Sequence, residues 1–275
     1  MNNIQKNIKV QRIREEIYQR IDNGIYDKDG EKWWQTDFSL NLIKTLYNPF
    51  RLDYAKKIFE RHEIHPFNKY ALEVGCGGGL LSEEIAKMGF ITMGIDPSEQ
   101  SINNAVAHAT ESGLLIQYGK GTGESLPLPN KSFEVVFCCD VLEHVRDLPL
   151  VISEISRVLK PGGIFIYDTI NRTQISKLVA IKILQEWNRW AILPPNLHVW
   201  DMFIRPNELK SLLTQNNLEW QEHRGIKPNI FALKILYYLH QRAKGKISYE
   251  EFGKKFRLIE SNSPLFSYIG YAIKR

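Results

Sequence analysis

The stretch ALEVGCGGGLLSEEIAKMGFITMGIDPSEQ, residues 71–100, decides the fold class. An apolar run ends in a glycine-rich turn, a helical pattern follows, and a second apolar run ends at Asp96. A strand, a glycine turn, a helix and a second strand that ends in an acid are typical of a parallel βαβ unit that grips the ribose of a nucleotide-like ligand. The identity of that ligand depends on the details of the turn.

The glycine pattern favours S-adenosylmethionine over a dinucleotide. A dinucleotide fingerprint reads G-x-G-x-x-G, but after Gly75 and Gly77 the third position is Leu80. Instead, Glu73 precedes three alternating glycines, and an acid there repels a pyrophosphate. S-adenosylmethionine has no phosphate and carries a sulfonium and an ammonium group, so it tolerates the acid, while the glycines let the backbone approach it. The remaining alternative is a turn that binds nothing, with a solvated acid at the strand end.

Further cofactor contacts are predicted from the position of polar residues at strand ends. Asp96 is placed to accept hydrogen bonds from both ribose hydroxyls. The segment GKGTGESLPLP, residues 119–129, follows the third predicted strand and brings Thr122 and Glu124 beside the adenine. The residues alone therefore predict cofactor contacts at Glu73, Gly75, Gly77, Asp96 and Thr122.

A regular alternation of strands and helices extends from residue 70 to residue 170. Strands are predicted at 70–74, 91–95, 114–119, 133–138 and 163–170. Helices are predicted at about 79–88, 98–112 and 147–159, and KPGG, residues 160–163, as a tight turn between a helix and a strand. This spacing indicates parallel βαβ units with helices on both faces of a sheet.

Helical segments are predicted on both flanks of this alternation. Residues 3–22 show helical spacing of their apolar positions, which are Ile8, Val10, Ile13, Ile17 and Ile21. One or two further helices follow over 31–62, with a break near Asn48-Pro49. Towards the other end, a closing strand over 263–275 is expected to pair with a strand at 218–226.

We therefore predict an α/β fold with a Rossmann-like, seven-stranded mixed sheet. Its last strand is antiparallel and helices cover both faces. Residues 1–65 form an N-terminal helical cap, and 66–275 form the main domain, with helical insertions at about 172–204 and 229–258.

The bulk properties fit a cytoplasmic globular protein. The chain has 275 residues, of which 43% are hydrophobic and 24% charged, and a net charge of +5 that argues for neither nucleic acid nor membrane. Cys76, Cys138 and Cys139 match no zinc-binding spacing and fit a reducing compartment. The first residues lack the apolar core of a secretory signal, and no run of 18 apolar residues predicts a membrane span.

The motif order LEVGCGGG, GIDPSE, FEVVFCCDVLEHVRD and RVLKPGG resembles class I S-adenosylmethionine-dependent methyltransferases. The flanking motifs EKWW, NPFRLDY, TINRT and HVWDMFIRPNEL are similar to the ubiquinone-biosynthesis O-methyltransferase family, over about 30–225. This resemblance implies methyl transfer to a catechol-type hydroxyl on a polyprenylated ring. It also implies cofactor contacts at Arg51, Gly75, Asp96 and Cys139, although the family usually has a larger apolar residue at the last position.

Two segments depart from the family pattern and leave the acceptor open. They are residues 35–50, after the paired tryptophans, and the basic insertion at 229–262. The alternatives are a methyltransferase of another small metabolite, for instance in secondary metabolism, and a non-catalytic module that binds S-adenosylmethionine. A nucleic-acid acceptor is not expected, because enzymes that methylate base amino groups resemble one another in an Asn/Asp-Pro-Pro-Tyr/Phe stretch that is absent here.

A phenol acceptor is mostly protonated at neutral pH, so its methylation needs a base or a metal. In CDVLEHV, residues 139–145, a helical turn would bring Asp140, Glu143 and His144 onto one face as ligands of a divalent metal such as Mg or Zn. His144 is alternatively a base, or a packed residue beside the cofactor. His198, in LPPNLHVWDMF, is a second catalytic candidate that lines an acceptor pocket, or else a loop residue that caps the next helix.

Residues 174–191 are predicted to form a tryptophan-rich amphipathic helix. One face carries Ile175, Leu178, Val179, Ile183, Trp187 and Trp190, and the other carries Lys182, Gln185, Glu186 and Arg189. Such a helix either docks on a membrane surface, where a lipophilic small-molecule acceptor resides, or packs on the domain as a lid. In the first case the protein is peripheral to the inner face of a membrane.

Overall fold

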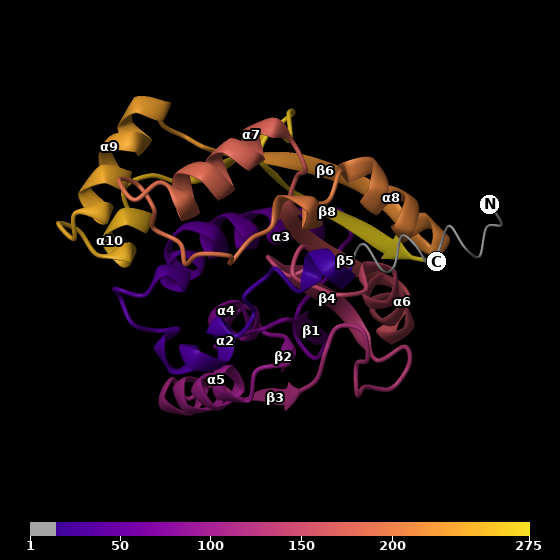
Figure 1. The fold of residues 1–275 in the computed structure, drawn as a ribbon. Coiled ribbons are helices and arrows are strands. Elements are labelled where there is room, and N and C mark those ends of the chain that lie inside the picture. Colours follow the sequence, from indigo (N-terminus) through magenta and orange to yellow (C-terminus); the bar gives the residue numbers. More distant parts are fainter. Residues whose placement is uncertain (1–14) are drawn as a thin grey trace.

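The computed structural model of the chain describes residues 15–275, which form a mixed eight-stranded sheet with helices on both faces (Figure 1). The strand order is β3-β2-β1-β4-β5-β8-β6-β7. The strands are β1 Tyr70–Val74, β2 Ile91–Asp96, β3 Ile116–Lys120, β4 Phe133–Cys139, β5 Leu159–Ile170, β6 Leu218–Pro228, β7 Leu258–Ser261 and β8 Ser267–Lys274. Neighbouring strands from β3 to β5 are parallel, and β8 is antiparallel to both β5 and β6.

The predicted Rossmann-like mixed sheet is confirmed, with two differences. The strand β7 is an eighth strand, antiparallel to β6, at the end of the segment predicted to be helical. It has four residues and no alternation of buried and exposed positions, so its sequence carries no strand signal. The predicted tight turn at residues 160–163 is instead a bulge within β5, because Leu159 pairs with Phe133 and Ile164 pairs with Val135.

Helices that pack on the two faces of the sheet bury two separate apolar clusters. On one face, α6 Leu148–Val158 and α8 Pro206–Gln215 contribute Val151, Ile155, Leu209 and Leu213. On the other face, α3 Asn48–Arg61 and α4 Leu80–Lys87 contribute Tyr54, Ile58, Leu81 and Ile85. The starts of two helices are fixed by caps, since Ser98 accepts the N–H of Ser101 before α5 Glu99–Glu111 and Asp147 accepts that of Leu150 before α6.

The segment before the sheet consists of short helices rather than long ones. They are α2 Ile25–Lys28, η1 Gly30–Lys32, η2 Ser39–Asn41 and the π-helix η3 Ile43–Tyr47, which leads into α3. Pro49 lies in the first turn of α3, where its missing N–H is harmless, in agreement with the predicted break. Most of the helix expected over 3–22, including Ile8, Val10 and Ile13, lies outside the described residues.

The two helical insertions lie beside one another over one part of the molecule (Figure 1). The first contains α7 Gln174–Ser176, the π-helix η4 Lys177–Glu186 and η5 Trp200–Met202. The second contains α9 Ala232–Ala243 and α10 Tyr249–Gly253. Their apolar side chains meet those of η3 in a cluster that includes Leu46, Leu184, Leu236 and Phe252. Among residues 15–275, every helix is too short or too polar to cross a membrane.

Candidate active site

One large cavity lies at the carboxyl edge of the parallel strands. Its volume is about 930 Å³, and Val74, Asp96, Cys139 and Ile170, at or near the ends of four neighbouring strands, line it. The short helices before α3 and the two insertions complete its walls. Ligands of open α/β sheets bind at this edge, and the volume is near the upper limit for a ligand pocket. The cavity is therefore large enough for a cofactor together with an acceptor.

The glycine turn lines the cavity with bare backbone. Gly75, Gly77 and Gly79 have positive φ angles of 75°, 50° and 81°, a conformation that side chains with a Cβ disfavour. Trp33 packs against the turn so closely that a Cβ on Gly77 would lie 2.5 Å from its ring. The indole of Trp34 donates a hydrogen bond to the carbonyl of Gly78, 2.9 Å away. The EKWW motif thus covers the outside of the turn.

Asp96 ends β2 beside this turn, as predicted. One carboxylate oxygen accepts the N–H of Gly77 at 2.8 Å, and the other accepts that of Ser98 at 2.9 Å. A carboxylate has about four lone-pair positions, so two remain available for a diol. Burial raises the pKa of Asp96 to about 6, and the two backbone N–H groups oppose this rise. The group is therefore ionised at neutral pH and already oriented.

Glu73 is buried in the middle of this edge and lines the cavity. Its carboxyl accepts a hydrogen bond from the hydroxyl of Ser82 on α4. Burial raises the pKa of Glu73 to about 8, so the group is largely protonated at neutral pH unless a cation lies nearby. Glu73 is therefore not a fixed negative charge, as the sequence suggested. A bound cation would favour its ionised form and be stabilised by it.

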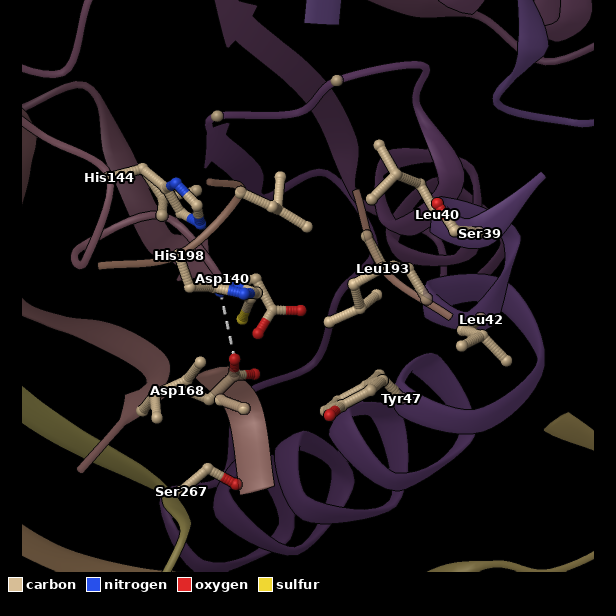
Figure 2. Close-up of a pocket in the computed structure, with 18 of the residues that line it drawn as sticks. Ser39, Leu40, Leu42, Tyr47, Asp140, His144, Asp168, Leu193, His198 and Ser267 are labelled. Atoms are coloured by element: carbon tan, nitrogen blue, oxygen red, sulfur yellow. Dashed lines mark hydrogen bonds between the residues drawn. The ribbon is translucent and has the colours of Figure 1, made fainter. Parts of the chain in front are cut away.

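Arg51 forms a buried ion cluster with two acids at the ends of β4 and β5. Its guanidinium binds Asp168 in a bidentate manner, with Nε–Oδ2 and Nη2–Oδ1 distances of 2.6 and 2.9 Å, and also pairs with Asp140. The Asp140 N–H donates to Asp168 as well, at 3.1 Å (Figure 2). Asp168 was not predicted as a site residue, although it is the acid in the apolar strand GIFIYDTI and lies near the carboxyl end of β5.

The predicted metal group is rearranged. Residues 141–144 form a turn rather than a helix, Asp140 has a positive φ of 54°, and its carboxylate pairs with Arg51. Glu143 and His144 are instead joined by His198, and one ligand atom from each lies within 4.8 Å of the others. The prediction of a helical turn over residues 140–144 was wrong because the chain turns sharply at Asp140, at the end of β4.

The two imidazoles face each other at one end of the cavity, with ring centroids 5.1 Å apart (Figure 2). Burial lowers the pKa of His144 to about 4 and that of His198 to about 3, so both rings are neutral at physiological pH. Both Nδ1 atoms and Oε1 of Glu143 are buried with no hydrogen-bond partner in the part of the chain that the structure describes. The other carboxylate oxygen of Glu143 accepts the hydroxyl of Thr169 at 2.8 Å.

Gln185 holds His198 in place, which the sequence did not predict. Its side-chain oxygen accepts the N–H of His198 at 2.7 Å, and its amide donates to the carbonyl of the same residue at 3.1 Å. The helical pattern assigned Gln185 to the polar outer face of 174–191, but it is buried. The reason is that η4 is a π-helix, whose wider turn shifts each position around the axis.

The remaining predicted cofactor residues lie around the cavity. Thr122 and Glu124 line it from the loop after β3, and Glu124 accepts the N–H of Arg146 at 2.9 Å. Cys139 lines it from the end of β4 and is buried. The structure thus places Arg51, Glu73, Gly75, Gly77, Asp96, Thr122 and Cys139 on the wall of one cavity.

Known proteins similar to this chain identify its family. A relative from Azorhizobium caulinodans named ubiquinone biosynthesis O-methyltransferase is 35% identical over 73% of this chain and 81% of its own length. Relatives of the same name from Rickettsia bellii and Rhizobium johnstonii are 32% and 34% identical, over 74% and 76% of this chain and 84% and 87% of theirs. The chain belongs to the ubiquinone biosynthesis O-methyltransferase family. Residues 72–167 also match a family described as a methyltransferase domain.

Solved structures support this family at the level of the fold. A magnesium protoporphyrin IX methyltransferase from Synechocystis, solved with bound S-adenosylhomocysteine, has a TM-score of 0.60, at 16% identity and 92% and 97% coverage of the two chains. An S-adenosylmethionine-dependent methyltransferase from Aquifex aeolicus has a TM-score of 0.56, at 14% identity and coverage of 90% and 99%. The chain is therefore an S-adenosylmethionine-dependent methyltransferase of the O-methyltransferase type, as predicted.

Proposed function

We propose that this enzyme methylates a catechol-type hydroxyl on a quinone precursor with a lipophilic ring substituent. The curated relatives are named for ubiquinone biosynthesis and O-methylation. The observation that carries the proposal is the half-buried pair of neutral imidazoles, His144 and His198, at the polar end of a cavity whose other walls are mostly apolar. A ring with adjacent hydroxyls and an apolar substituent matches both parts of that cavity.

The proposed cofactor contacts come from the residues around the glycine turn. Asp96 accepts the ribose hydroxyls, Gly75 and Gly77 allow close approach of the backbone, and Thr122 contacts the adenine. Arg51, Glu73 and Cys139 complete the contacts near the methionine portion. The supporting observations are their common place on the cavity wall and the two free acceptor positions of Asp96.

The reaction is an in-line displacement at the sulfonium. An acceptor oxygen forms a bond to the methyl carbon, the carbon–sulfur bond breaks, and the pair of electrons returns to sulfur as the neutral thioether. Alignment of the two reactants contributes up to roughly 7–11 kcal/mol in favourable cases. The proton of the hydroxyl must leave. We propose His144 or His198 as its acceptor; because burial lowers the pKa of these rings to about 4 and 3, they act as bases only when the charge that develops on the bound reactants raises that pKa.

A divalent cation fits the same residues. Oε1 of Glu143 and Nδ1 of both histidines are buried without hydrogen-bond partners in the described chain, and one ligand atom from each of these residues lies within 4.8 Å of the others. Neutral imidazole is the form that binds metals, and burial with the charge of Asp140 raises the pKa of Glu143, which a cation would reverse. We propose Glu143, His144 and His198 as the residues that would hold Mg²⁺ or Zn²⁺, and the ion would lower the pKa of a hydroxyl bound to it.

Membrane contact through 174–191 is also part of the proposal. Ile175, Leu178 and Trp187 are exposed apolar residues on the first insertion, and Trp187 is 54% exposed. Trp190 is less exposed and stacks edge-on against Trp187 at 5.3 Å. Exposed tryptophan beside Lys182 and Arg189 is typical of helices that lie on anionic lipid surfaces. We propose peripheral attachment of this cytoplasmic enzyme to the inner face of a membrane.

We also propose a division of the chain into an N-terminal cap and a methyltransferase domain. We assign residues 1–65 as the N-terminal cap, of which the described short helices before α3 cover the glycine turn while α3 packs on the sheet, and 66–275 as the methyltransferase domain. Insertions at about 172–204 and 229–258 build the acceptor site. The contacts of Trp33 and Trp34 with the glycine turn support the first part, and the cavity-lining residues of η4 and α9 support the second.

The acceptor class is tested by mass spectrometry of products formed from S-adenosylmethionine and a panel of acceptors. We expect catechols to gain one methyl group on oxygen, with S-adenosylhomocysteine formed in equal amount, and monophenols and amines to react much more slowly. Transfer to an amine or carbon acceptor in preference to every catechol would contradict the proposal. No transfer to any acceptor would indicate a binding module.

Chelation separates the two routes for the proton. EDTA should abolish turnover, and Mg²⁺ or Zn²⁺ should restore it, if Glu143, His144 and His198 hold a cation. Full turnover after chelation would assign proton removal to the imidazoles alone.

Co-sedimentation with anionic vesicles should decrease in Trp187→Ala, and unchanged co-sedimentation would contradict the membrane contact.

A further inference from the structure

The geometry points to Tyr26 as the residue that recognises the second hydroxyl of a catechol-type acceptor, and so selects two adjacent hydroxyls over a single phenol. The inference rests on the proposed function and deepens it, because it names the group that reads one feature of the acceptor. Tyr26 lies in α2, shortly before the paired tryptophans. No motif of the sequence predicted a role for it.

Two side-chain hydroxyls hold the backbone of Tyr26 beside the cofactor end. Its carbonyl oxygen accepts hydrogen bonds from the hydroxyl of Ser98 at 2.8 Å and from that of Ser101 at 3.0 Å. Ser98 also donates its N–H to Asp96, the acid proposed to bind the ribose, at 2.9 Å. Tyr26 is therefore placed by the same turn that orients Asp96, at the start of α5.

The ring of Tyr26 contacts residues of both ends of the cavity. Its centroid lies 6.0 Å from that of Trp33, which packs on the glycine turn, and the two planes are nearly parallel, at 9°. The same ring meets His144 edge to face, with centroids 6.1 Å apart and planes at 85°. The amide of Asn23 donates to the carbonyl of His144 at 3.3 Å, which ties the same segment to the acceptor end. Tyr26 therefore lies between the two ends.

The hydroxyl of Tyr26 is available to a ligand. Tyr26 lines the cavity, and its hydroxyl makes no hydrogen bond to any of residues 15–275. Burial raises the pKa of this phenol far above its usual value, and the charges of Glu143, Asp140 and Asp96 raise it further. Acids of both ends thus lie near the phenol, which stays neutral and can both donate and accept a hydrogen bond.

Two other tyrosines line the cavity but are placed for different contacts. The hydroxyl of Tyr18 accepts a hydrogen bond from the amide of Asn23 at 3.3 Å. The ring of Tyr47 has its centroid 5.2 Å from Cζ of Arg51, and Figure 2 shows it apart from the two histidines. Within the part of the chain that the structure describes, Tyr26 is therefore the tyrosine whose ring contacts a proposed catalytic histidine.

A catechol-type acceptor has two adjacent hydroxyls, and only one of them attacks the methyl carbon. In the proposed arrangement that hydroxyl lies at His144 and His198. The hydroxyl next to it needs a partner as well, because a buried polar group without one weakens binding. Tyr26 supplies this partner beside His144, since its phenol can donate to the neighbouring oxygen or accept a hydrogen bond from it. A single phenol leaves the hydroxyl of Tyr26 unpaired and is therefore disfavoured.

The test compares catechol with phenol in the unaltered enzyme and in Tyr26→Phe, which keeps the ring and removes the hydroxyl. In the unaltered enzyme, kcat/KM should be much higher for catechol than for phenol. In Tyr26→Phe the ratio of these two values should decrease about tenfold or more, because only catechol loses a hydrogen bond. Calorimetric affinities of both compounds for the complex with S-adenosylhomocysteine should change in the same ratio, and this measurement does not depend on turnover of phenol.

Tyr47→Phe is the matched control, because it removes the same hydroxyl from another wall of the cavity. It should leave the ratio of catechol to phenol as it is in the unaltered enzyme. A general disturbance of the site would lower both values alike and keep their ratio constant. A constant ratio in Tyr26→Phe, or an equal decrease in both variants, would overturn the inference and leave the proposed function intact. Absence of methyl transfer to catechols in the unaltered enzyme would remove the proposed function and this inference with it.

Discussion

The two ends of the cavity differ in how their buried polar groups are satisfied. At the cofactor end, Asp96 accepts two backbone N–H groups and Arg51 donates four hydrogen bonds to Asp168, Asp140 and Asn48. At the acceptor end, Glu143, His144 and His198 each have a buried polar atom without a hydrogen-bond partner within residues 15–275. Asp96 and Arg51 at the first end are therefore oriented without a ligand, and we propose that a ligand supplies the missing partners at the second.

This difference has an energetic meaning. A buried polar group without a partner costs about 1–3 kcal/mol, so three such atoms place the acceptor end under a substantial penalty. A ligand that satisfies these atoms recovers that free energy as binding. At the cofactor end, Asp96 instead offers acceptor positions that are already oriented by two backbone N–H groups. Each of the following experiments tests one side of this contrast.

The largest effect on stability is expected from Trp33→Ala at the cofactor end. Trp33 is buried, packs on Gly77 and Gly78, and donates from its indole to Ser101 at 2.9 Å. Truncation of a buried tryptophan costs about 3–5 kcal/mol of unfolding free energy. Urea denaturation measures this, and Trp187→Ala is the control, with less than about 0.5 kcal/mol because the side chain is half exposed. Equal losses in the two variants would contradict the role of Trp33.

Asp96→Ala should weaken binding of S-adenosylmethionine at least about a hundredfold. The variant removes two charge-assisted hydrogen bonds to the ribose, each worth about 1.5–3 kcal/mol. Isothermal titration calorimetry gives the dissociation constant. Glu99→Ala is the control, since this neighbouring acid forms only an exposed ion pair with Lys120. Unchanged affinity in Asp96→Ala would remove the ribose assignment.

Gln185→Ala should lower kcat about tenfold and leave cofactor affinity unchanged. Gln185 acts through the backbone of His198, so its loss disturbs the placement of the imidazole rather than the binding of the cofactor. Gln185→Glu keeps the acceptor of the His198 N–H and should retain intermediate activity. Glu186→Ala, at the exposed end of η4, is the control. Loss of cofactor affinity in parallel with kcat would indicate general disruption instead.

The smallest expected effect is the contribution of Asp96 to the pH dependence of cofactor binding, measured in a Glu73→Gln background because the ionisation of Glu73, whose pKa is raised to about 8, would otherwise add a larger dependence. In the proposed arrangement Asp96 binds the ribose as a carboxylate. Its pKa is raised to about 6, so its contribution to affinity is complete above this pH and decreases as pH falls through it. At pH 5.5 about three quarters of the unliganded protein is protonated at this group, which weakens binding about fourfold relative to pH 7.5. Calorimetry at both pH values measures the ratio. A constant affinity would show that the group is not titrating there.

The cofactor end could be predicted from the sequence because its geometry is local. The turn between β1 and α4 and the acid at the end of β2 lie within about 25 residues of one another, and their spacing in the sequence fixes their spacing in space. The Rossmann-like sheet followed from the same local alternation. The short edge strand β7 did not, because only pairing with β6 makes its four residues a strand.

The acceptor end could be predicted only in part because it depends on contacts distant in sequence. His144 and His198 are 54 positions apart. Both were predicted as catalytic candidates, but the predicted metal group joined His144 to Asp140, whereas the structure joins it to His198. The positive φ of Asp140 and the π-helical form of η4 broke the regular spacing on which those assignments relied. Asp168 and Gln185 were missed because their partners, Arg51 and His198, come from other elements.

A crystal structure with S-adenosylhomocysteine and a long-chain 4-alkylcatechol tests the contrast between the two ends most directly. The ribose should lie on an unmoved Asp96, and one catechol oxygen should lie beside Glu143, His144 and His198. A ring bound away from both histidines, or an Asp96 that turns to meet the ribose only when the cofactor binds, would contradict the proposed arrangement.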